Sequence, residues 1–285
     1  MLKIRIVSAC ILMPLVILLI SYLPLFIFII INIAVCMLAA WEWGLLAGII
    51  THGQRAFIAM LYGFILLIMV YILQITQNNL QQFEIQAFLW VSIIWWFSAF
   101  ILVSFYPSSA GLWRNSRLLR LLFGMFILIP FFLSIILLRI YTNNIKNITG
   151  TWWLLIVMFL VWSADSGAYI FGRYFGKHLL APKISPGKTW EGLFAGLLFS
   201  TIIAWLFSLL APFNNIKISM LFFFSIIIVL TSVLGDLTES MFKREAGIKN
   251  SGNLIPGHGG ILDRIDSLTS AVPILVYLLL IFRFF

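Results

Sequence analysis

The polar stretch 240–266 carries the residue types that bind metal and phosphate. Asp263 and Asp266 are three positions apart, so a helix would place both carboxylates on one face. Mg²⁺ is commonly bound through one or two carboxylates together with phosphate oxygens of a substrate. Gly259 and Gly260, just before them, allow the backbone to approach a ligand closely. We therefore expect a site for Mg²⁺ and phosphate in this stretch.

Two further carboxylates, Asp165 and Asp236, lie within or at the edge of long apolar runs. A charged side chain facing lipid costs several kcal/mol, so such residues normally face a cavity or a partner. Small neighbours such as Gly167 and Gly235 allow another helix or a ligand to approach closely. A buried ion pair or a hydrogen bond between helices is the alternative interpretation, and we favour a functional site.

The loop 185–192 contains a second phosphate-binding candidate. Its Gly187-Lys188-Thr189 resembles the end of a P-loop, but Pro182 occupies the place of the first glycine and an apolar run follows. These features exclude a P-loop. Lys188 nevertheless precedes the amino end of a predicted helix, where basic side chains and free amides suit phosphate. An ordinary positively charged loop is the equally weighted alternative.

Composition requires a membrane as the solvent for these elements. Of 285 residues, 63% are hydrophobic and 9% are charged, whereas soluble domains have about 25% charged residues. The net charge of +9 is better explained by cytoplasmic Lys and Arg near anionic lipid than by nucleic-acid binding. The sequence therefore predicts an all-α polytopic integral membrane protein, and we expect no nucleic-acid partner.

Nine apolar runs are long enough to be transmembrane helices. The break at Pro24 separates the first two of them. The predicted spans are residues 5–22, 25–49, 56–75, 87–105, 118–141, 152–172, 190–211, 218–241 and 267–284.

Basic residues predict the orientation of these spans. With nine spans, the side that holds the N-terminus carries Lys3, Arg5, Arg55, Arg114, Arg117, Arg120, Arg173, Lys177, Lys183, Lys188, Lys243, Arg244, Lys249 and Arg264. The other side carries only Arg139, Lys146, Lys217 and Arg283. Lys and Arg are enriched in cytoplasmic loops, so we place the N-terminus in the cytoplasm and the C-terminus outside.

The acidic residues divide the chain into two functional parts. Only Glu42 and Glu84 of the nine acids precede residue 151. We therefore expect residues 1–150 to form scaffold helices and residues 151–285 to carry the active site, within one membrane domain.

The stretch 240–266 resembles the signature of the phosphatidate cytidylyltransferases, also called CDP-diacylglycerol synthases. That signature runs Ser-x-x-Lys-Arg, then a Lys-Asp pair, then His-Gly-Gly-x-x-Asp-Arg-x-Asp. The matching residues here are Ser240, Lys243, Arg244, Lys249, His258, Gly259, Gly260, Asp263, Arg264 and Asp266. The resemblance extends through the Asp165 segment and the loop 185–192, and covers essentially the whole chain. One departure is Asn250, which stands where the family has Asp and lacks its negative charge.

The resemblance implies transfer of CMP from CTP to phosphatidate, giving CDP-diacylglycerol and pyrophosphate, the activation step of phospholipid biosynthesis. It implies Mg²⁺ as cofactor, with room for a second monovalent or divalent cation, and a polar cavity open to the cytoplasm. The expected location is the bacterial cytoplasmic (inner) membrane, with the active site at its cytoplasmic face. A homodimer stays open, because the Gly192–Gly196 spacing can pack helices within or between chains.

We assign roles on this basis. Metal ligands are expected to be Asp236, Asp263, Asp266 and, less directly, Asp165. Residues expected to act in catalysis are Asp236, Lys243, Arg244, Asp263, Arg264 and Asp266. Residues expected to bind substrate are Lys188, Ser240, Lys249, His258, Gly259 and Gly260. We favour a role for His258 in orienting a substrate by a hydrogen bond over the alternative role of a general base.

Two other functions remain open from the sequence alone. A membrane transporter also places acids inside the bilayer, although no paired pattern recurs in the two halves of this chain. A CTP-dependent polyprenol kinase would use similar chemistry on another lipid.

Overall fold

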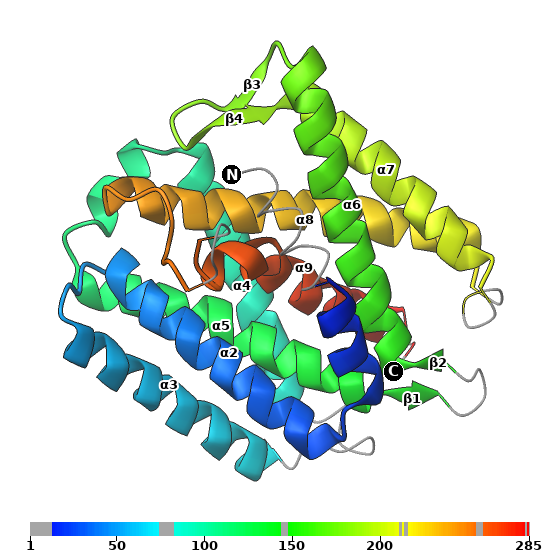
Figure 1. Cartoon of the computed structure of the whole chain (residues 1–285), viewed down its shortest axis with the longest axis horizontal. Coiled ribbons are helices and arrows are strands. Elements are labelled where there is room, and N and C mark those ends of the chain that lie inside the picture. The colour runs from blue at the N-terminus through cyan, green and yellow to red at the C-terminus, as the bar shows by residue number, and fades with distance from the viewer. Residues whose placement is uncertain are drawn as a thin grey trace.

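The fold is a bundle of long apolar helices. The computed structural model describes residues 13–73, 83–143, 148–210, 213, 216–254, 259–282 and 284. Within this part of the chain, eight helices are long and apolar enough to cross a membrane. They are α2 (Leu25–Leu46), α3 (His52–Leu73), α4 (Phe83–Ser104), α5 (Arg117–Ile140), α6 (Gly150–Phe175), α7 (Trp190–Ser208), α8 (Ile218–Glu245) and α9 (Leu262–Ile281) (Figure 1).

The structure confirms the all-α membrane fold and eight of the predicted spans. The first predicted span, 5–22, lies only partly within the described residues, where it is the shorter apolar helix Met13–Tyr22. The predicted break at Pro24 is present, because Pro24 is the N-cap of α2. The largest shift is in α9, which begins at Leu262 rather than at residue 267. The stretch with Asp263 and Asp266 is therefore already helical.

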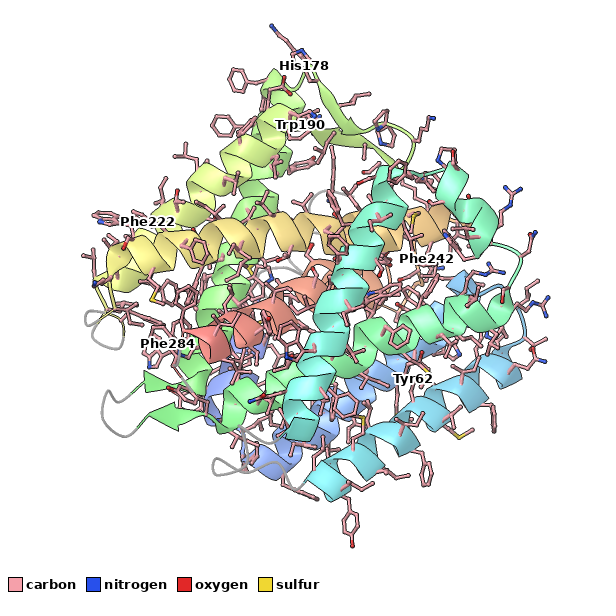
Figure 2. All side chains as sticks on the ribbon, turned by 180° about the vertical axis from the view of Figure 1, so that it is seen from behind. Tyr62, His178, Trp190, Phe222, Phe242 and Phe284 are labelled. Atoms are coloured by element: carbon pink, nitrogen blue, oxygen red, sulfur yellow. The ribbon has the colours of Figure 1, made fainter. Side chains whose placement is uncertain are left out.

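Large apolar side chains cover the outside of the bundle as well as its interior. Phe64 on α3, Phe97 on α4 and Phe194 on α7 are each more than 60% exposed. Figure 2 shows such side chains projecting outward from the helices, while Phe242 lies in the interior. An exterior of this kind is stable in lipid rather than in water, as the composition indicates.

Helix α8 lies at the centre of the elements that matter for the site. It packs against α4, α6, α7 and α9. Gly235 of α8 allows the close contact with α9, since a Cβ there would collide with the side chain of Ser270 and the carbonyl of Asp266. In Figure 1, α8 crosses the molecule next to α9, and α2, α3 and α5 run side by side on the other flank.

Helices α6 and α7 form the tightest helix pair. Gly192 and Gly196 of α7 face the carbonyls of Ala168 and Ala164 of α6, with no room for a Cβ. Small residues four apart allow this close approach. The glycine spacing therefore packs two helices within the chain. The same contact fixes the position of Asp165, which follows Ala164 on α6.

Two small antiparallel hairpins interrupt the helices, and the sequence did not predict them. The first pairs β1 (Thr142–Asn143) with β2 (Ile148–Thr149). The second pairs β3 (Leu179–Ala181) with β4 (Ser185–Thr189). Strand β4 contains Lys188, and the next residue, Thr189, caps α7 by accepting a hydrogen bond from the amide of Gly192 at 3.1 Å. The β3–β4 hairpin thus gives Lys188 a fixed place beside α8.

Candidate functional site

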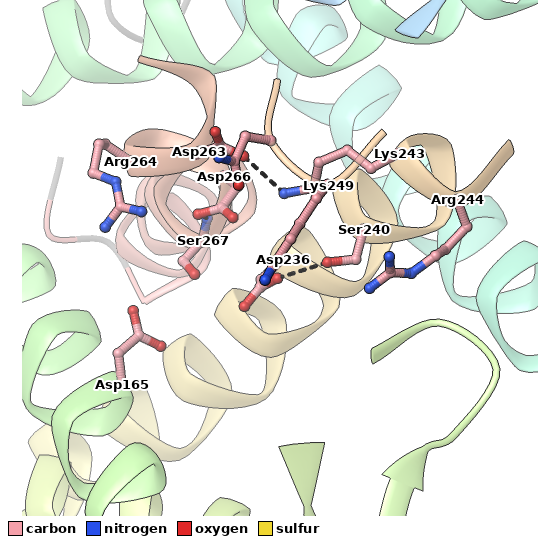
Figure 3. Close-up of a pocket in the computed structure, with 11 residues that line it drawn as sticks. Asp165, Asp236, Ser240, Lys243, Arg244, Lys249, Asp263, Arg264, Asp266 and Ser267 are labelled. Carbon is pink, nitrogen blue, oxygen red and sulfur yellow. Dashed lines mark hydrogen bonds and ion pairs between the residues drawn. The ribbon is translucent and has the colours of Figure 1, made fainter. Parts of the chain in front are cut away.

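A polar cavity of about 330 Å³ brings the predicted site residues together. Its walls come from α6, α8, α9 and the connection between α8 and α9 (Figure 3). The lining residues are Asp165, Asp236, Ser240, Lys243, Arg244, Lys249, Asn250, Asp263, Arg264, Asp266 and Ser267. Four carboxylates and four basic side chains therefore share one small space.

Asp236 lies on α8 between two partners. Its Oδ2 is 2.6 Å from the Nζ of Lys188, and its Oδ1 accepts a hydrogen bond of 3.1 Å from the hydroxyl of Ser240, one turn further along the helix. Figure 3 shows Asp236 and Ser240 joined on the same face of α8. The sequence predicted these three residues as site residues, but it did not predict that Lys188 and Asp236 pair with each other.

Asp263, in the first turn of α9, is the most heavily hydrogen-bonded of the predicted ligands. Its Oδ1 accepts a bond of 2.8 Å from the Nζ of Lys243. Its Oδ2 accepts bonds from the backbone amides of Ser251, at 3.0 Å, and Gly260, at 2.8 Å. Gly259 has a φ of +86°, and a Cβ there would collide with Oδ2 of Asp263. The Gly259–Gly260 pair is thus required for the backbone to reach this carboxylate.

Glu239 is a buried acid beside the cavity. The residue is 3% exposed, and neither carboxylate oxygen accepts a hydrogen bond from a described residue. Its nearest opposite charge is Lys243, at 3.5 Å. Asp266 of α9 lies close enough for electrostatic repulsion with both Glu239 and Asp236. A buried acid with unsatisfied oxygens costs free energy unless a cation or a proton compensates it.

The donor set suits a hard cation, although its ligands are not yet gathered around one point. No three of the described His, Cys, Asp and Glu side chains converge tightly enough to form a ready metal site. Two of the four predicted ligands, Asp236 and Asp263, are paired with lysines. The carboxyl groups of Glu239 and Asp266 lie beside each other and offer oxygen ligands, the kind that Mg²⁺ prefers.

The basic residues fall into two groups. Lys188 and Lys243 are paired with carboxylates, whereas Lys249 and Arg264 make no ion pair or side-chain hydrogen bond with any described residue. Arg244 belongs to neither group, since its Nε donates a hydrogen bond of 2.8 Å to the carbonyl of Ile184 and so ties α8 to the β3–β4 hairpin. Unpaired cations in a cavity are the natural contacts for phosphate groups.

Most predicted site residues therefore meet in one place, with two qualifications. Lys188 reaches the site through Asp236 and lines a neighbouring cavity of about 240 Å³, to which Asp165 and Asp236 also contribute. His258 lies outside the described residues, and its expected orienting role stays a prediction.

Two more cavities with mostly apolar walls lie beside the polar cavity. The 240 Å³ cavity shares Leu180, Leu193 and Val233 with a third cavity of about 410 Å³ beneath the β3–β4 hairpin. The third cavity is lined mainly by apolar residues of α4, α7 and α8. The three cavities thus lead from carboxylates and basic side chains to apolar side chains.

Sequence reasoning missed several residues at this site. Glu42, assigned to the scaffold, accepts hydrogen bonds from the segment that also holds Asp263. Glu239 and Ser267 were not singled out, and Asn250 was excluded although it lines the cavity. An acid inside an apolar run was the available signal for Glu42 and Glu239, the same signal that identified Asp165.

The comparison with known proteins agrees with the motif. The sequence pattern of the cytidylyltransferase family matches residues 3–282. A phosphatidate cytidylyltransferase from Haemophilus influenzae is 43% identical over 290 residues, covering 97% of this chain and 98% of that protein. One from Pseudomonas aeruginosa is 39% identical over 282 residues, covering 98% and 97%. The family pattern matches nearly the whole chain, and the motif residues lie together in one cavity of this structure. This chain therefore belongs to the cytidylyltransferase family.

Proposed function

We propose that this membrane protein transfers CMP from CTP to phosphatidate, giving CDP-diacylglycerol and pyrophosphate. The observation that carries the proposal is the single cavity that collects the acids and bases of the 240–266 stretch with Asp165 and Asp236. Relatives that carry the name phosphatidate cytidylyltransferase match nearly the whole chain at 43% and 39% identity. CTP, phosphatidate and membrane lipid are therefore its expected partners.

The reaction forms one bond and breaks one. A phosphate oxygen of phosphatidate attacks the α-phosphorus of CTP, and the bond from that phosphorus to the pyrophosphate oxygen breaks. The attacking phosphate is already anionic, so the site does not need a general base. Catalysis then depends on aligning two anionic substrates and neutralising their charge, as in phosphoryl transfer generally.

The acids are proposed to hold Mg²⁺. Asp236, Asp263 and Asp266 are the proposed ligands, with Asp165 across the cavity, and the carboxyl group of Glu239 lies beside Asp266. When bound, the ion would offset the charge of the triphosphate and of the leaving pyrophosphate. Lys188 and Lys243 hold two of these acids in place in the structure described here.

The basic residues are proposed to divide the phosphate contacts. Lys249 and Arg264 form no ion pair with a described residue, so their charge is available to substrate phosphates. Arg244 donates a hydrogen bond from its Nε to the Ile184 carbonyl, and its two terminal nitrogens remain available to a phosphate in the cavity. Lys188 can contact a phosphate only by sharing or leaving Asp236.

The apolar cavities suit the lipid substrate. Phosphatidate must keep its acyl chains in an apolar environment while its phosphate reaches a water-soluble nucleotide. The series of cavities from Asp236 past Leu193 to the 410 Å³ space under the hairpin supports this arrangement.

We place the polar cavity at the cytoplasmic face of the bacterial inner membrane, on the basis of the basic residues around it. A homodimer and a second cation remain part of the proposal without bearing on the chemistry above.

The test is a transfer assay with purified protein. CTP labelled on the α-phosphorus and, separately, on the γ-phosphorus is incubated with phosphatidate in detergent or vesicles with Mg²⁺. The proposal expects the α-label in the lipid and the γ-label in pyrophosphate. Transfer of the γ-label to a lipid would instead identify a kinase, and no transfer of either label would favour a transporter.

A further inference from the structure

The carboxylate of Glu42 on α2 is bonded to the segment that leads into α9. Glu42 is fully buried, and its Oε2 accepts hydrogen bonds from the hydroxyl of Ser251, at 2.9 Å, and the amide of Leu262, at 2.8 Å. Its Oε1 accepts a bond of 3.1 Å from the amide of Ile261. The partners lie more than 200 residues away in sequence.

These bonds make Glu42 the cap of α9. The first amides of a helix have no partner within the helix, and the N-cap residue of α9, Ile261, supplies no side-chain cap. Glu42, which is on α2, accepts hydrogen bonds from two of these amides. Its negative charge also suits the positive end of the α9 dipole. Glu42 itself stands near the C-terminal end of α2, where that helix's own dipole disfavours an anion. Its placement is therefore explained by α9 rather than by α2.

The same segment is bound from its other side by Asp263. Ser251 donates its hydroxyl to Glu42 and its amide to Asp263. Gly260 donates its amide to Asp263, while a Cβ on Gly260 would collide with the Glu42 carboxylate. A Cβ on Gly252 would collide with it as well. Both carboxylates thus bond Ser251 and the residues at the start of α9, and one of them, Asp263, belongs to the cavity.

Arg55, on the neighbouring helix α3, lies near enough to Glu42 for electrostatic attraction. Arg55 of α3 donates its Nε to the carbonyl of Trp41 at 2.8 Å, and its guanidinium lies 3.6 Å from the centre of the Trp41 ring. Arg55 is also buried, and no described residue forms an ion pair with either Arg55 or Glu42. Among the described residues, the hydrogen bonds to the Glu42 carboxylate therefore all come from Ser251 and from the residues at the start of α9.

We infer that Glu42 is a positioning residue for the reaction: it caps α9 from α2 and sets the register at which Asp263, Arg264 and Asp266 enter the cavity. This inference rests on the proposed function. Residues 1–150 then contribute to the site as well as to the scaffold. Glu42 does not line the cavity, so it acts through the residues that it holds.

The experiment compares Glu42→Gln with the unaltered protein in two readouts. The amide replacement keeps the size of the side chain but turns one acceptor into a donor facing backbone amides. We expect kcat to fall tenfold or more with the KM for CTP changed less than threefold. We also expect hydrogen–deuterium exchange of the amides of residues 260–264 to rise tenfold or more, while exchange within α5 and α6 stays unchanged. The matched control is Glu84→Gln, the same chemical change in the first turn of α4, among the residues 1–150 that are assigned to the scaffold, and it should keep kcat within twofold.

The outcomes separate positioning from a merely structural role. Unchanged exchange at residues 260–264, or unchanged kcat per folded molecule with only a lower melting temperature, overturns the inference. If Glu42→Gln does not accumulate, Ser251→Ala removes one of the three hydrogen bonds and carries the test. A fall in kcat of threefold or more with faster exchange supports the inference, and no change in either overturns it. If the unaltered protein makes no CDP-diacylglycerol, the proposed function fails, and the exchange readout alone decides whether Glu42 positions α9.

Discussion

The Nζ of Lys188 lies 2.6 Å from Oδ2 of Asp236, which ties the β3–β4 hairpin to the middle of α8. Both side chains are about a quarter exposed, so water screens the pair only partly. The sequence predicted that Lys188 binds phosphate and that Asp236 binds metal. In this structure their charges neutralise each other. An incoming phosphate must compete with Asp236 for Lys188.

Replacing Lys188 should therefore harm the site in two ways. In Lys188→Met, Asp236 loses its counter-charge and an anionic substrate loses a partner, so we expect CDP-diacylglycerol synthesis to fall tenfold or more. Lys188→Arg should retain more activity, because it keeps the charge. Initial rates at saturating CTP and phosphatidate measure both. Lys177→Met, an exposed lysine just before the hairpin, is the control and should keep its rate within twofold. Equal rates for the two methionine variants would disprove a role for the pair.

Asp263→Asn should abolish product formation while the protein still accumulates. The change removes the charge that Lys243 contacts and weakens the acceptor of two backbone amides. Loss of one preorganised electrostatic contact typically costs about 10² to 10³ in kcat, and here one group serves several contacts. The measurement is labelled CMP transfer per amount of folded protein after size-exclusion chromatography. Activity within tenfold of the unaltered protein would remove Asp263 from the site.

Arg264→Met tests whether the unpaired cations bind phosphate. A hydrogen bond to a charged group contributes about 1.5–3 kcal/mol, and 1.4 kcal/mol corresponds to a factor of about ten in affinity. We expect the KM of one substrate to rise about tenfold to a hundredfold, and that substrate is the one whose phosphate Arg264 contacts. Arg117→Met, at the exposed start of α5, is the control. Unchanged KM values for both CTP and phosphatidate would show that Arg264 binds neither.

Asn250→Asp tests the departure from the family signature. Asn250 lines a cavity that already contains four carboxylates, so a further carboxylate should strengthen cation binding. We expect the unaltered protein to be active and the variant to reach half-maximal rate at a lower Mg²⁺ concentration. Titration of the rate with Mg²⁺ after treatment with EDTA gives both midpoints. Identical midpoints would mean that this position only shapes the connection to α9.

The predicted orientation has a direct test. A reporter enzyme that is active only outside the cytoplasm, fused after Phe285, should be active, because nine spans and a cytoplasmic N-terminus place the C-terminus outside. The same reporter inserted between Lys183 and Ile184 in the β3–β4 hairpin should be inactive. A cytoplasmic C-terminus would contradict the nine-span count.

Most of the fold could be predicted because apolar runs are a local signal. Lengths near 20 residues and breaks such as Pro24 identify membrane helices without any knowledge of their partners. The β3–β4 hairpin could not be predicted in this way. Its strands have only three and five residues, and β4 packs against α6, α7 and α8 instead of showing an alternating pattern. The early start of α9 was missed for a related reason, since its cap comes from Glu42.

The site could be predicted to the extent that its residues lie in one continuous motif. Asp263, Arg264 and Asp266 meet Lys243 because the connection 246–261 returns the chain from the end of α8 to the start of α9 beside it. The missed contacts are those that join distant segments, such as Glu42 with Leu262, separated by 220 positions. Nothing local to Glu42 indicates its partner. An acid in an apolar run still predicts that some partner exists.

The bond between α2 and α9 has a consequence for how the protein is made. Glu42 is synthesised more than 200 residues before Ser251 and Leu262. At about 5–20 residues per second, the nascent chain carries that carboxylate without its final partners for roughly 10 to 40 seconds. The insertion machinery, water at the membrane surface or a bound proton must shelter it during that interval. Helix α9 then closes a contact that α2 leaves open, so the site matures only after α9 has been made.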